Sequence, residues 1–453
     1  MQKNIYEQRS LTKLILIFGI PSILALMIEM MTGIIDTAFA GNLPKIGDSA
    51  LAAMALISPI LMIFTALQTL FAMSTGILIA KYLNNKEKQN QSYITGITMS
   101  IIIAIITSFI CYFMLINILS VLGASGEIFD LAYKYLKIQL ISNIFSSIGY
   151  TLTCCIRAFG YPKIEVMIIT SAVIINIIFN YIMAFQLKMG ITGLALGTLI
   201  SEIVCSLIAI LFLISKKLWI NKQVISIKNF INSTWELFKI GIAQTVIQIL
   251  GGCTGFVINA RLLTLGSMNY IAAWSIVGRI YTFILMPIVG ITQGVQNIIA
   301  YFNGNKQPEK IKKIAHRTMI MCTIYGFITL LLMISFGHHF IMFFGGNHEI
   351  VTIAQKALFI VVLGFPAIGI LYTEMTILQV TEHEVSSILL ILSRQVFFLI
   401  PLIYIIPALA SIINISPIIA LFFCMPLSDI LSVIFSKIVK KYLSLKTKKE
   451  VYI

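Results

Sequence analysis

The sequence has very few charged residues for its length. Of 453 residues, 11% are charged and 59% are hydrophobic, whereas about a quarter of the residues in a soluble domain are charged. So few charges cannot cover a water-facing surface, which excludes an ordinary soluble globular protein. Apolar runs of roughly 18 or more residues recur along the whole chain, and each is long enough to cross a hydrocarbon core of about 30 Å. The composition therefore predicts an all-α integral membrane protein.

Signals of enzymes and of nucleic-acid-binding proteins are also missing. The sequence has no Gly-rich phosphate loop and no nucleophile motif, so we expect no enzymatic activity and no cofactor. The seven cysteines lie in apolar runs without metal-ligand spacing, which predicts buried core thiols and no metal centre. The net charge of +15 would suggest nucleic acid in a soluble protein. Here the basic residues lie in short loops between apolar runs, which instead favours the lipid bilayer as the partner.

Charge clusters, prolines and glycines divide the chain into about twelve predicted transmembrane helices. Their approximate ranges are 13–40, 50–80, 93–117, 128–157, 163–187, 190–215, 236–261, 269–301, 316–337, 350–380, 385–409 and 414–438. The first apolar run is too long for the core of a signal peptide and lacks a small-residue cleavage site, so we expect a retained first span.

The distribution of Lys and Arg predicts the orientation. If the N-terminus faces the cytoplasm, the inside segments carry 24 basic residues and the outside segments carry six. Cytoplasmic loops of membrane proteins are enriched in basic residues. We therefore expect a multi-pass protein of the plasma (inner) membrane with both termini in the cytoplasm.

The chain also repeats itself at an offset of about 220 residues. Three segments match in the same order: Leu122–Leu136 with Phe344–Leu358 (six identical positions), Ile79–Ala80 with Ile299–Ala300, and Gly19–Ile20 with Gly241–Ile242. Six spans per copy is an even number, so both copies begin on the same side, which predicts a parallel repeat. The predicted domains are an N-lobe (1–215), a cytoplasmic linker (216–235), and a C-lobe with a basic cytoplasmic tail (236–453).

Four local motifs resemble one transporter family. They are Ile20–Gly41, with an early Pro21 and with Asp36 shortly before Gly41; Arg157–Pro162, an Arg-Ala-x-Gly-x-Pro turn; Ile175–Tyr181, with two Asn residues four apart; and Gly190–Thr198. In this order and spacing they resemble the MATE (multidrug and toxic compound extrusion) family over essentially the whole chain. The resemblance implies two six-helix bundles in a V shape, alternating access, and export of amphipathic organic cations in exchange for H⁺ or Na⁺.

Asp36 is the leading candidate for binding the coupling ion. An Asp at a helix centre disfavours membrane insertion by roughly 2.5–3.5 kcal/mol, so such a residue is expected to be functional. Asn176 and Asn180 share one helix face, and we expect them at a similar depth, with Thr198 adding a hydroxyl. Their oxygens suit a hard cation such as Na⁺, while burial favours a protonated carboxyl group, so Asp36 is equally a candidate proton carrier. The alternative is that these polar groups only hold helices together.

Further residues are candidates for the substrate cavity. Glu29 lies two helical turns before Asp36 and is suited to attract cationic drugs or dyes, and Gln248 stands where some family members have an acidic residue. Met54 is one of 20 methionines, whose soft side chains suit varied ligands.

Glu374 and Arg394 lie on neighbouring spans and are candidates for a simple ion pair. The resemblance implies a second acidic site in some family members, but here Gln244 and Gln248 stand where a Glu is expected and Glu374 does not align with the family's acidic residue, which argues against a second ion site. We expect a monomer.

The main alternative function is a flippase for lipid-linked oligosaccharide or polysaccharide, of a related fold. Such proteins typically have more spans and a cationic cavity for pyrophosphate. Apart from Arg279 and Arg394, the predicted spans lack basic residues, which favours the exporter.

Overall fold

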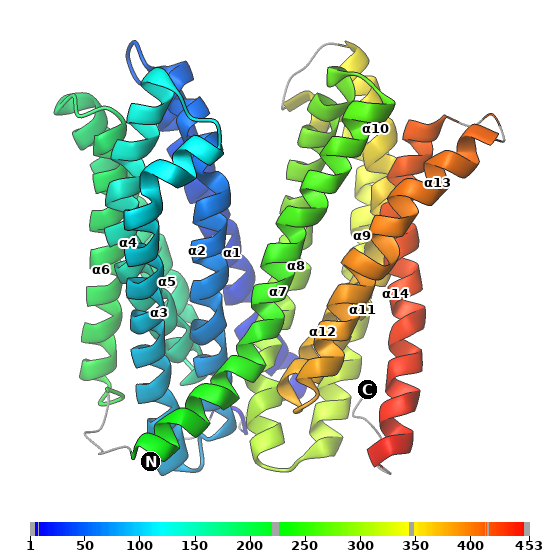
Figure 1. Cartoon of the computed structure of the whole chain (residues 1–453). Helices are drawn as coiled ribbons and strands as arrows, with labels where there is room; N and C mark the ends of the chain where they lie inside the picture. Colours follow the sequence, from blue (N-terminus) through cyan, green and yellow to red (C-terminus); the bar gives the residue numbers. More distant parts are fainter. Residues whose placement is uncertain are drawn as a thin grey trace. The chain divides into compact units, whose positions relative to one another are not determined.

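In the computed structural model the chain is built from long helices (Figure 1). The structure describes residues 5–7, 9–219, 226–343, 348–412, 414 and 416–447, and these contain no β-strand. The elements are α1 (Leu11–Gly41), α2 (Gly47–Lys81), α3 (Lys86–Val121), α4 (Gly126–Ala158), α5 (Pro162–Tyr181), η1 (Ile182–Gln186), α6 (Ile191–Ser215), α7 (Ile227–Leu265), α8 (Met268–Gly304), α9 (Pro308–Phe343), α10 (His348–Val361), η2 (Val362–Gly364), α11 (Phe365–Val380), α12 (Glu384–Leu392), η3 (Ser393–Leu399), α13 (Ile400–Ile412) and α14 (Pro417–Thr447). The all-α prediction is confirmed.

Eleven helical segments of the described chain are long and apolar enough to cross a membrane. One of them, His348–Val380, combines α10, η2 and α11, and another, Glu384–Ile412, combines α12, η3 and α13. The twelfth predicted span is α4, which is long but more polar. Its buried face includes Gln139 and Asn143. These polar side chains pack against other helices of the protein and so avoid contact with lipid.

The chain divides into two compact units. Unit 1 contains Met1–Gln8 and Leu24–Thr245, and unit 2 contains Arg9–Ile23 and Val246–Ile453. The boundaries therefore fall inside α1 and α7, because the first half of each helix packs in a different unit from its second half. Residues 220–225 of the predicted linker, 344–347 of the second repeat copy, and 448–453 of the predicted tail lie outside the described residues.

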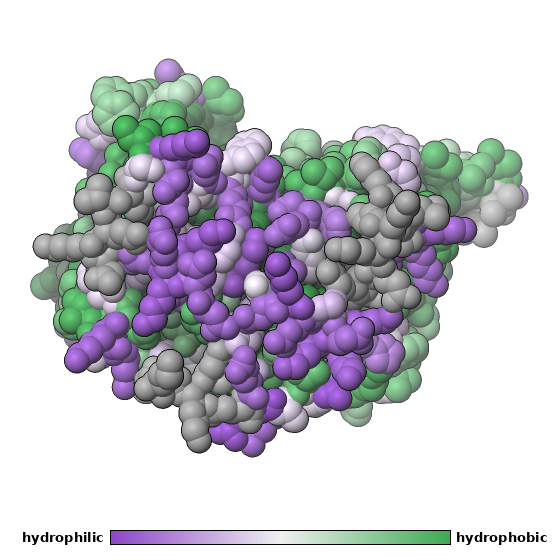
Figure 2. All heavy atoms as spheres, turned by 90° about the horizontal axis from the view of Figure 1, so that it is seen from below, coloured by the Kyte–Doolittle hydropathy of each residue, from purple (hydrophilic) through white to green (hydrophobic). Residues whose placement is uncertain are grey.

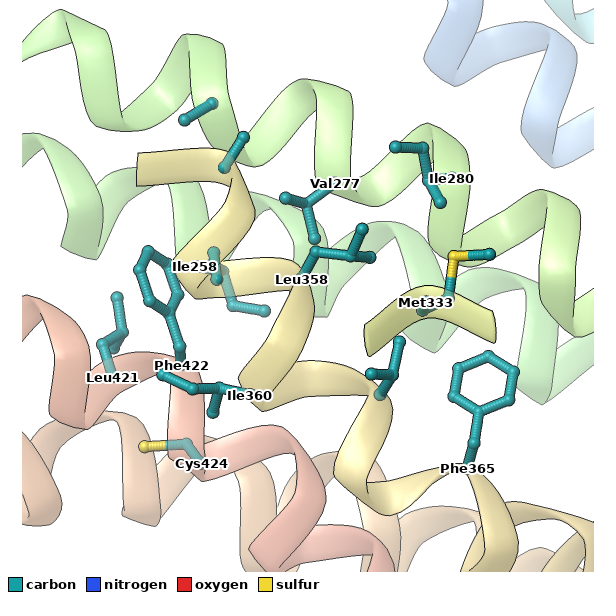
Figure 3. Close-up of a cluster of buried hydrophobic side chains, with 14 of the residues drawn as sticks. Ile258, Val277, Ile280, Met333, Leu358, Ile360, Phe365, Leu421, Phe422 and Cys424 are labelled. Atoms are coloured by element: carbon teal, nitrogen blue, oxygen red, sulfur yellow. The ribbon is translucent and has the colours of Figure 1, made fainter. Parts of the chain in front are cut away.

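In unit 1, α4 packs against α2, α3 and α6, and α5 packs against α6. In unit 2, α8 packs against α9, α10 and α11, and α14 packs against α10, α11 and α13. Figure 3 shows the apolar core of unit 2, where Val277 of α8, Leu358 of α10 and Phe422 of α14 are among the buried side chains. Most of the remaining apolar surface consists of exposed Ile, Leu and Phe side chains, as expected for helices that contact lipid.

Two glycines at matched positions of the repeat make matched contacts. A Cβ atom on Gly241 of α7 would lie 1.8 Å from the carbonyl oxygen of Leu70 in unit 1, and one on Gly19 of α1 would lie 3.5 Å from Ile291 in unit 2. Leu70 and Ile291 are themselves about 220 residues apart. The internal repeat is therefore visible in the helix packing.

Replacing Gly241 by alanine is expected to destabilise unit 1, because the added methyl group has no room beside the α2 backbone. Overpacking of this kind typically costs about 1–3 kcal/mol. The matched control is Gly251→Ala on the same helix, where an added Cβ meets nothing within 4 Å and helix propensity improves. Thermal melting of the two purified variants in detergent checks the prediction. Equal melting temperatures would contradict the observed close contact.

The cysteines follow the prediction with one exception. Cys111, Cys154, Cys155, Cys205, Cys322 and Cys424 are buried, whereas Cys253 is exposed. The prediction of a buried core thiol is wrong for Cys253. Its run is apolar, and apolar runs predict a membrane span, but within a span they do not tell which side chains pack inside the protein.

Candidate functional site

Four predicted site residues lie together in unit 1. The Nδ2 atom of Asn180 donates hydrogen bonds to Oδ1 of Asp36 (2.6 Å) and to Oδ1 of Asn176 (3.1 Å). Nδ2 of Asn176 in turn donates to Oγ1 of Thr198 (3.3 Å). The side chains of Asn176 and Asn180 are buried, and Asp36 is partly buried. Helices α1, α5 and α6 therefore share one continuous hydrogen-bonded set.

The local sequence explains how α5 and α6 approach so closely. A Cβ atom on Gly197 would lie 2.1 Å from Oδ1 of Asn180, and one on Gly193 would lie 2.6 Å from the backbone nitrogen of Ala184. Two glycines four residues apart thus let the α6 backbone come close to α5 at Gly197 and to the segment Ile182–Gln186 at Gly193. The π-helical segment Ile182–Gln186 follows Asn180 at once, and such segments are frequent at functional sites.

One oxygen of this set has no partner. Oδ1 of Asn180 is buried and accepts no hydrogen bond, although buried carbonyl oxygens nearly always do so. The amide nitrogen of the same side chain faces the Asp36 carboxylate, whereas this oxygen faces the α6 backbone, where a Cβ atom on Gly197 would lie 2.1 Å from it. The carboxylate of Asp36 is the group of this set that can bind a proton or a hard cation.

Sequence reasoning missed two further members of the site. Tyr135 of α4 is buried and interacts with the side chains of Gln139 and Thr198, close enough to Asp36 for an electrostatic interaction. Tyr135 and Gln139 are four residues apart, so they share a face of α4. Their spacing is the same as that of Asn176 and Asn180, and this spacing was the sequence signal that could have indicated their place in the site.

The predicted cavity residues are distributed over both units. Glu29 of α1 and Glu202 of α6 interact electrostatically within unit 1, and Glu202 also contacts Ser146. Met54 of α2 packs partly buried against the apolar core of unit 1. Gln248 belongs to unit 2 and is partly buried.

In unit 2 the predicted pairing of Glu374 with Arg394 is wrong. Nε of Arg394 donates to Oδ1 of Asp429 (2.6 Å), while Lys440 pairs with Glu374. Helix α14 carries both Asp429 and Lys440, so it supplies the partner for each charge. Arg394 also donates to the hydroxyl of Tyr281 (2.9 Å). Glu374 and Asp429 are the buried carboxylates of the described part of unit 2, and each is paired with a base.

Where the structure describes the chain, no group of three or more His, Cys, Asp or Glu side chains is arranged to hold a metal ion.

The fold matches solved structures of transporters along its whole length. The chain aligns with an outward-facing multidrug resistance MATE family transporter of the MOP superfamily with a TM-score of 0.89 and 17% identity, covering 99% of both chains. It aligns with a Vibrio cholerae MATE transporter, VcmN, in a variant with one aspartate replaced by asparagine, with a TM-score of 0.88 and 20% identity over 98% of both chains. These similarities show that the chain has the same polytopic helical fold as those two proteins.

The sequence comparisons establish the family. The MatE family model matches residues 21–182 and 244–405, two segments of equal length that follow the internal repeat. The chain is also 29% identical over 410 residues to the multidrug export protein MepA of Staphylococcus haemolyticus (89% of each chain) and 28% identical over 416 residues to that of Staphylococcus saprophyticus (90% of each). The chain belongs to the MATE family.

Proposed function

We propose that this protein is a secondary active multidrug efflux antiporter. It exports amphipathic organic cations in exchange for H⁺ or Na⁺ by alternating access. The observation that carries the proposal is the hydrogen-bonded set of Asp36, Asn176, Asn180 and Thr198 inside the spans of unit 1. The names of the MepA relatives, which are multidrug export proteins, support the substrate class.

The Asp36 set is the proposed coupling site. A carboxylate among membrane-spanning helices is costly to leave charged and unpaired, so its charge is expected to be neutralised in the transport cycle by a bound proton or Na⁺. Thr198 accepts a hydrogen bond from the amide of Asn176, which in turn accepts one from the amide of Asn180. Tyr135 contacts Thr198 and so supports this arrangement from α4.

The acidic residues of unit 1 support a cationic substrate. Glu29 and Glu202 provide two further acidic side chains, on two helices of the same unit, with which a cation can pair. A flippase that binds a lipid-linked pyrophosphate needs the opposite polarity. Arg394, one of the two basic residues predicted inside the spans, is already paired with Asp429, so it offers no free positive charge to a phosphate. Met54 and Gln248 remain candidates for contact with substrate.

We further propose that both termini face the cytoplasm and that the protein is a monomer. The 24-to-6 distribution of basic residues supports cytoplasmic termini in the plasma (inner) membrane. In unit 1, the end of the helices at which α7 begins would then face the cytoplasm. A monomer contains the complete coupling set, since all four residues come from one chain.

Dye transport by purified protein in liposomes tests the proposal. One-for-one exchange of a proton for a monovalent dye is electroneutral, so a pH difference of one unit can sustain about a tenfold dye gradient. We expect ethidium to move against its gradient when either a pH or a Na⁺ gradient is imposed, and the gradient that works identifies the ion. Protein-free liposomes and liposomes without any gradient are the controls. Failure of both gradients to drive any cationic dye would overturn the proposal.

A further inference from the structure

The beginning of α7 extends beyond the membrane core. Helix α7 has 39 residues, about 58 Å at 1.5 Å per residue, whereas a hydrocarbon core is about 30 Å thick. The part from Ile240 to Leu265 alone spans about 39 Å and suffices to cross it. The helix is therefore longer than one crossing needs, and its lysines Lys228 and Lys239 mark the first thirteen residues (Ile227–Lys239), here called the entry segment, as the part expected at the membrane surface. In Figure 1 they form the oblique start of α7 at the bottom of unit 1.

The entry segment carries an unusual apolar stripe on its outer face. Ile227, Ile231 and Trp235 follow each other at four-residue intervals and are 80%, 60% and 58% exposed. Residues at this spacing lie above one another on a helix. Lys228 and Lys239 are also exposed and lie along one edge of the stripe. Nζ of Lys239 lies 5.4 Å from the centre of the Trp235 ring, which joins the positive charge to the apolar surface.

The opposite face fixes the segment to unit 1. Ser233, Leu237 and Ile240 are buried. Glu236 accepts hydrogen bonds from Nζ of Lys81 (3.0 Å) and from the hydroxyl of Tyr82 (2.7 Å), where α2 ends. Gln91 of α3 donates to the backbone oxygen of Asn229 (2.9 Å).

The Tyr82 hydroxyl stays protonated and therefore keeps donating its hydrogen bond to Glu236. Burial, and then the hydrogen bond to Glu236, raise the pKa of Tyr82 to about 12, so its hydroxyl keeps its proton at any physiological pH. The negative charge of Glu236 lies on the face of α7 that contacts the end of α2, where it pairs with Lys81. The outer face is left with positive charge and apolar side chains.

We propose that the entry segment is an interfacial helix that binds anionic phospholipid at the membrane surface, with the apolar stripe among the upper acyl chains and with Lys228 and Lys239 on the headgroup phosphates. An apolar sector bordered by lysines and containing a tryptophan is typical of helices that lie in the membrane interface. The entry segment lies at the bottom of unit 1 in Figure 1, and hydrophilic side chains gather on the face seen from below in Figure 2. A position at the membrane surface, next to water, agrees with this. Each lysine close to an anionic surface strengthens binding roughly fivefold.

The proposal is tested with the full chain and its own tryptophan. The sequence has three Trp residues, so Trp219→Phe with Trp274→Phe leaves Trp235 as the sole emitter. The protein is reconstituted in liposomes that contain either brominated phosphatidylglycerol or brominated phosphatidylcholine, with the bromine near the top or near the end of the acyl chain. We expect strong quenching by top-brominated lipid, and stronger quenching by phosphatidylglycerol.

Lysine substitutions then isolate the headgroup contact. In Lys228→Gln with Lys239→Gln, the preference for phosphatidylglycerol is expected to fall by up to about 25-fold, roughly fivefold for each lysine. The matched control is Lys86→Gln with Lys313→Gln, which removes two exposed lysines from other helix beginnings, and it should keep the preference. Size-exclusion chromatography verifies that both variants are folded.

Three results would overturn the proposal. The first is equal quenching of Trp235 by the two lipids. The second is deeper quenching by lipid brominated at the chain end, which would place the stripe within the hydrocarbon core. The third is protection of Trp235 from all brominated lipids together with elution as a dimer, which would identify a second copy of this chain as the occupant.

Discussion

Replacing Asp36 by asparagine is expected to abolish gradient-driven dye efflux while the protein remains folded. Asparagine has the size and shape of aspartate, and its carbonyl oxygen can still accept the hydrogen bond from Nδ2 of Asn180 that Asp36 accepts at 2.6 Å. It cannot take up a proton, and it has no charge to balance a bound Na⁺. Under a pH difference of one unit, the dye ratio should fall from about tenfold to about one.

The measurement is ethidium accumulation in inverted vesicles or liposomes, normalised to the amount of folded transporter. Asp130→Asn is the matched control, because it makes the same chemical change at an exposed position near the start of α4. Efflux at the unsubstituted rate in Asp36→Asn would show that the carboxylate has only a structural role. A poorly folded variant is recognised separately by its elution profile and melting temperature.

Much of the fold could be predicted because a membrane imposes a simple rule on sequence. Every span needs about 20 apolar residues, so the helices could be counted from the runs alone. Asp36, Asn176 and Asn180 could be found for the related reason that polar groups are costly in an apolar run. The i, i+4 spacing predicted that the two asparagines share one helix face. In the structure they are hydrogen-bonded to each other, and Asn180 is also bonded to Asp36.

The polar helix α4 shows where this reasoning fails. Its residues Tyr135 and Gln139 join the site through contacts with Thr198, but α4 contains several polar side chains, so none of them stood out. A polar residue is informative only against an apolar background. Which polar residue of a mixed helix points into the site depends on the rotation of that helix, which the sequence pattern did not determine.

Partners across helices were likewise not determined by sequence. Glu374 and Arg394 lie on consecutive helices of the chain, and opposite charges on neighbouring helices suggest a pair. In the structure both residues pair with α14 instead: Arg394 pairs with Asp429, and Glu374 pairs with Lys440. The division of α1 and α7 between the two units has the same origin. A hydrophobic run predicts that a helix exists, whereas its neighbours depend on the packing of all the helices together.

The Arg394–Asp429 pair leads to the second large expected effect. Asp429→Leu should strongly destabilise unit 2, because it leaves the buried guanidinium of Arg394 without a carboxylate, beside the neutral hydroxyl of Tyr281 and the ring of Tyr372. Breaking a buried ion pair from one side typically costs about 3–5 kcal/mol, since the remaining charge is buried without compensation. We expect a much lower yield of folded protein and a clearly lower melting temperature. Asp130→Leu, which removes an exposed carboxylate, should change stability by less than about 0.5 kcal/mol.

The double variant Arg394→Met with Asp429→Leu separates the loss of charge balance from the loss of the pair itself. Removing both charges leaves apolar side chains of similar size, and such replacements are often neutral or stabilising. Folding should therefore recover to near the original level, although Asp429→Leu alone unfolds the unit. If the double variant is as unstable as the single one, the hydrogen bonds of this cluster matter more than its charge balance. Dye efflux by the recovered variant then measures whether the pair contributes to transport, because the fold is no longer limiting.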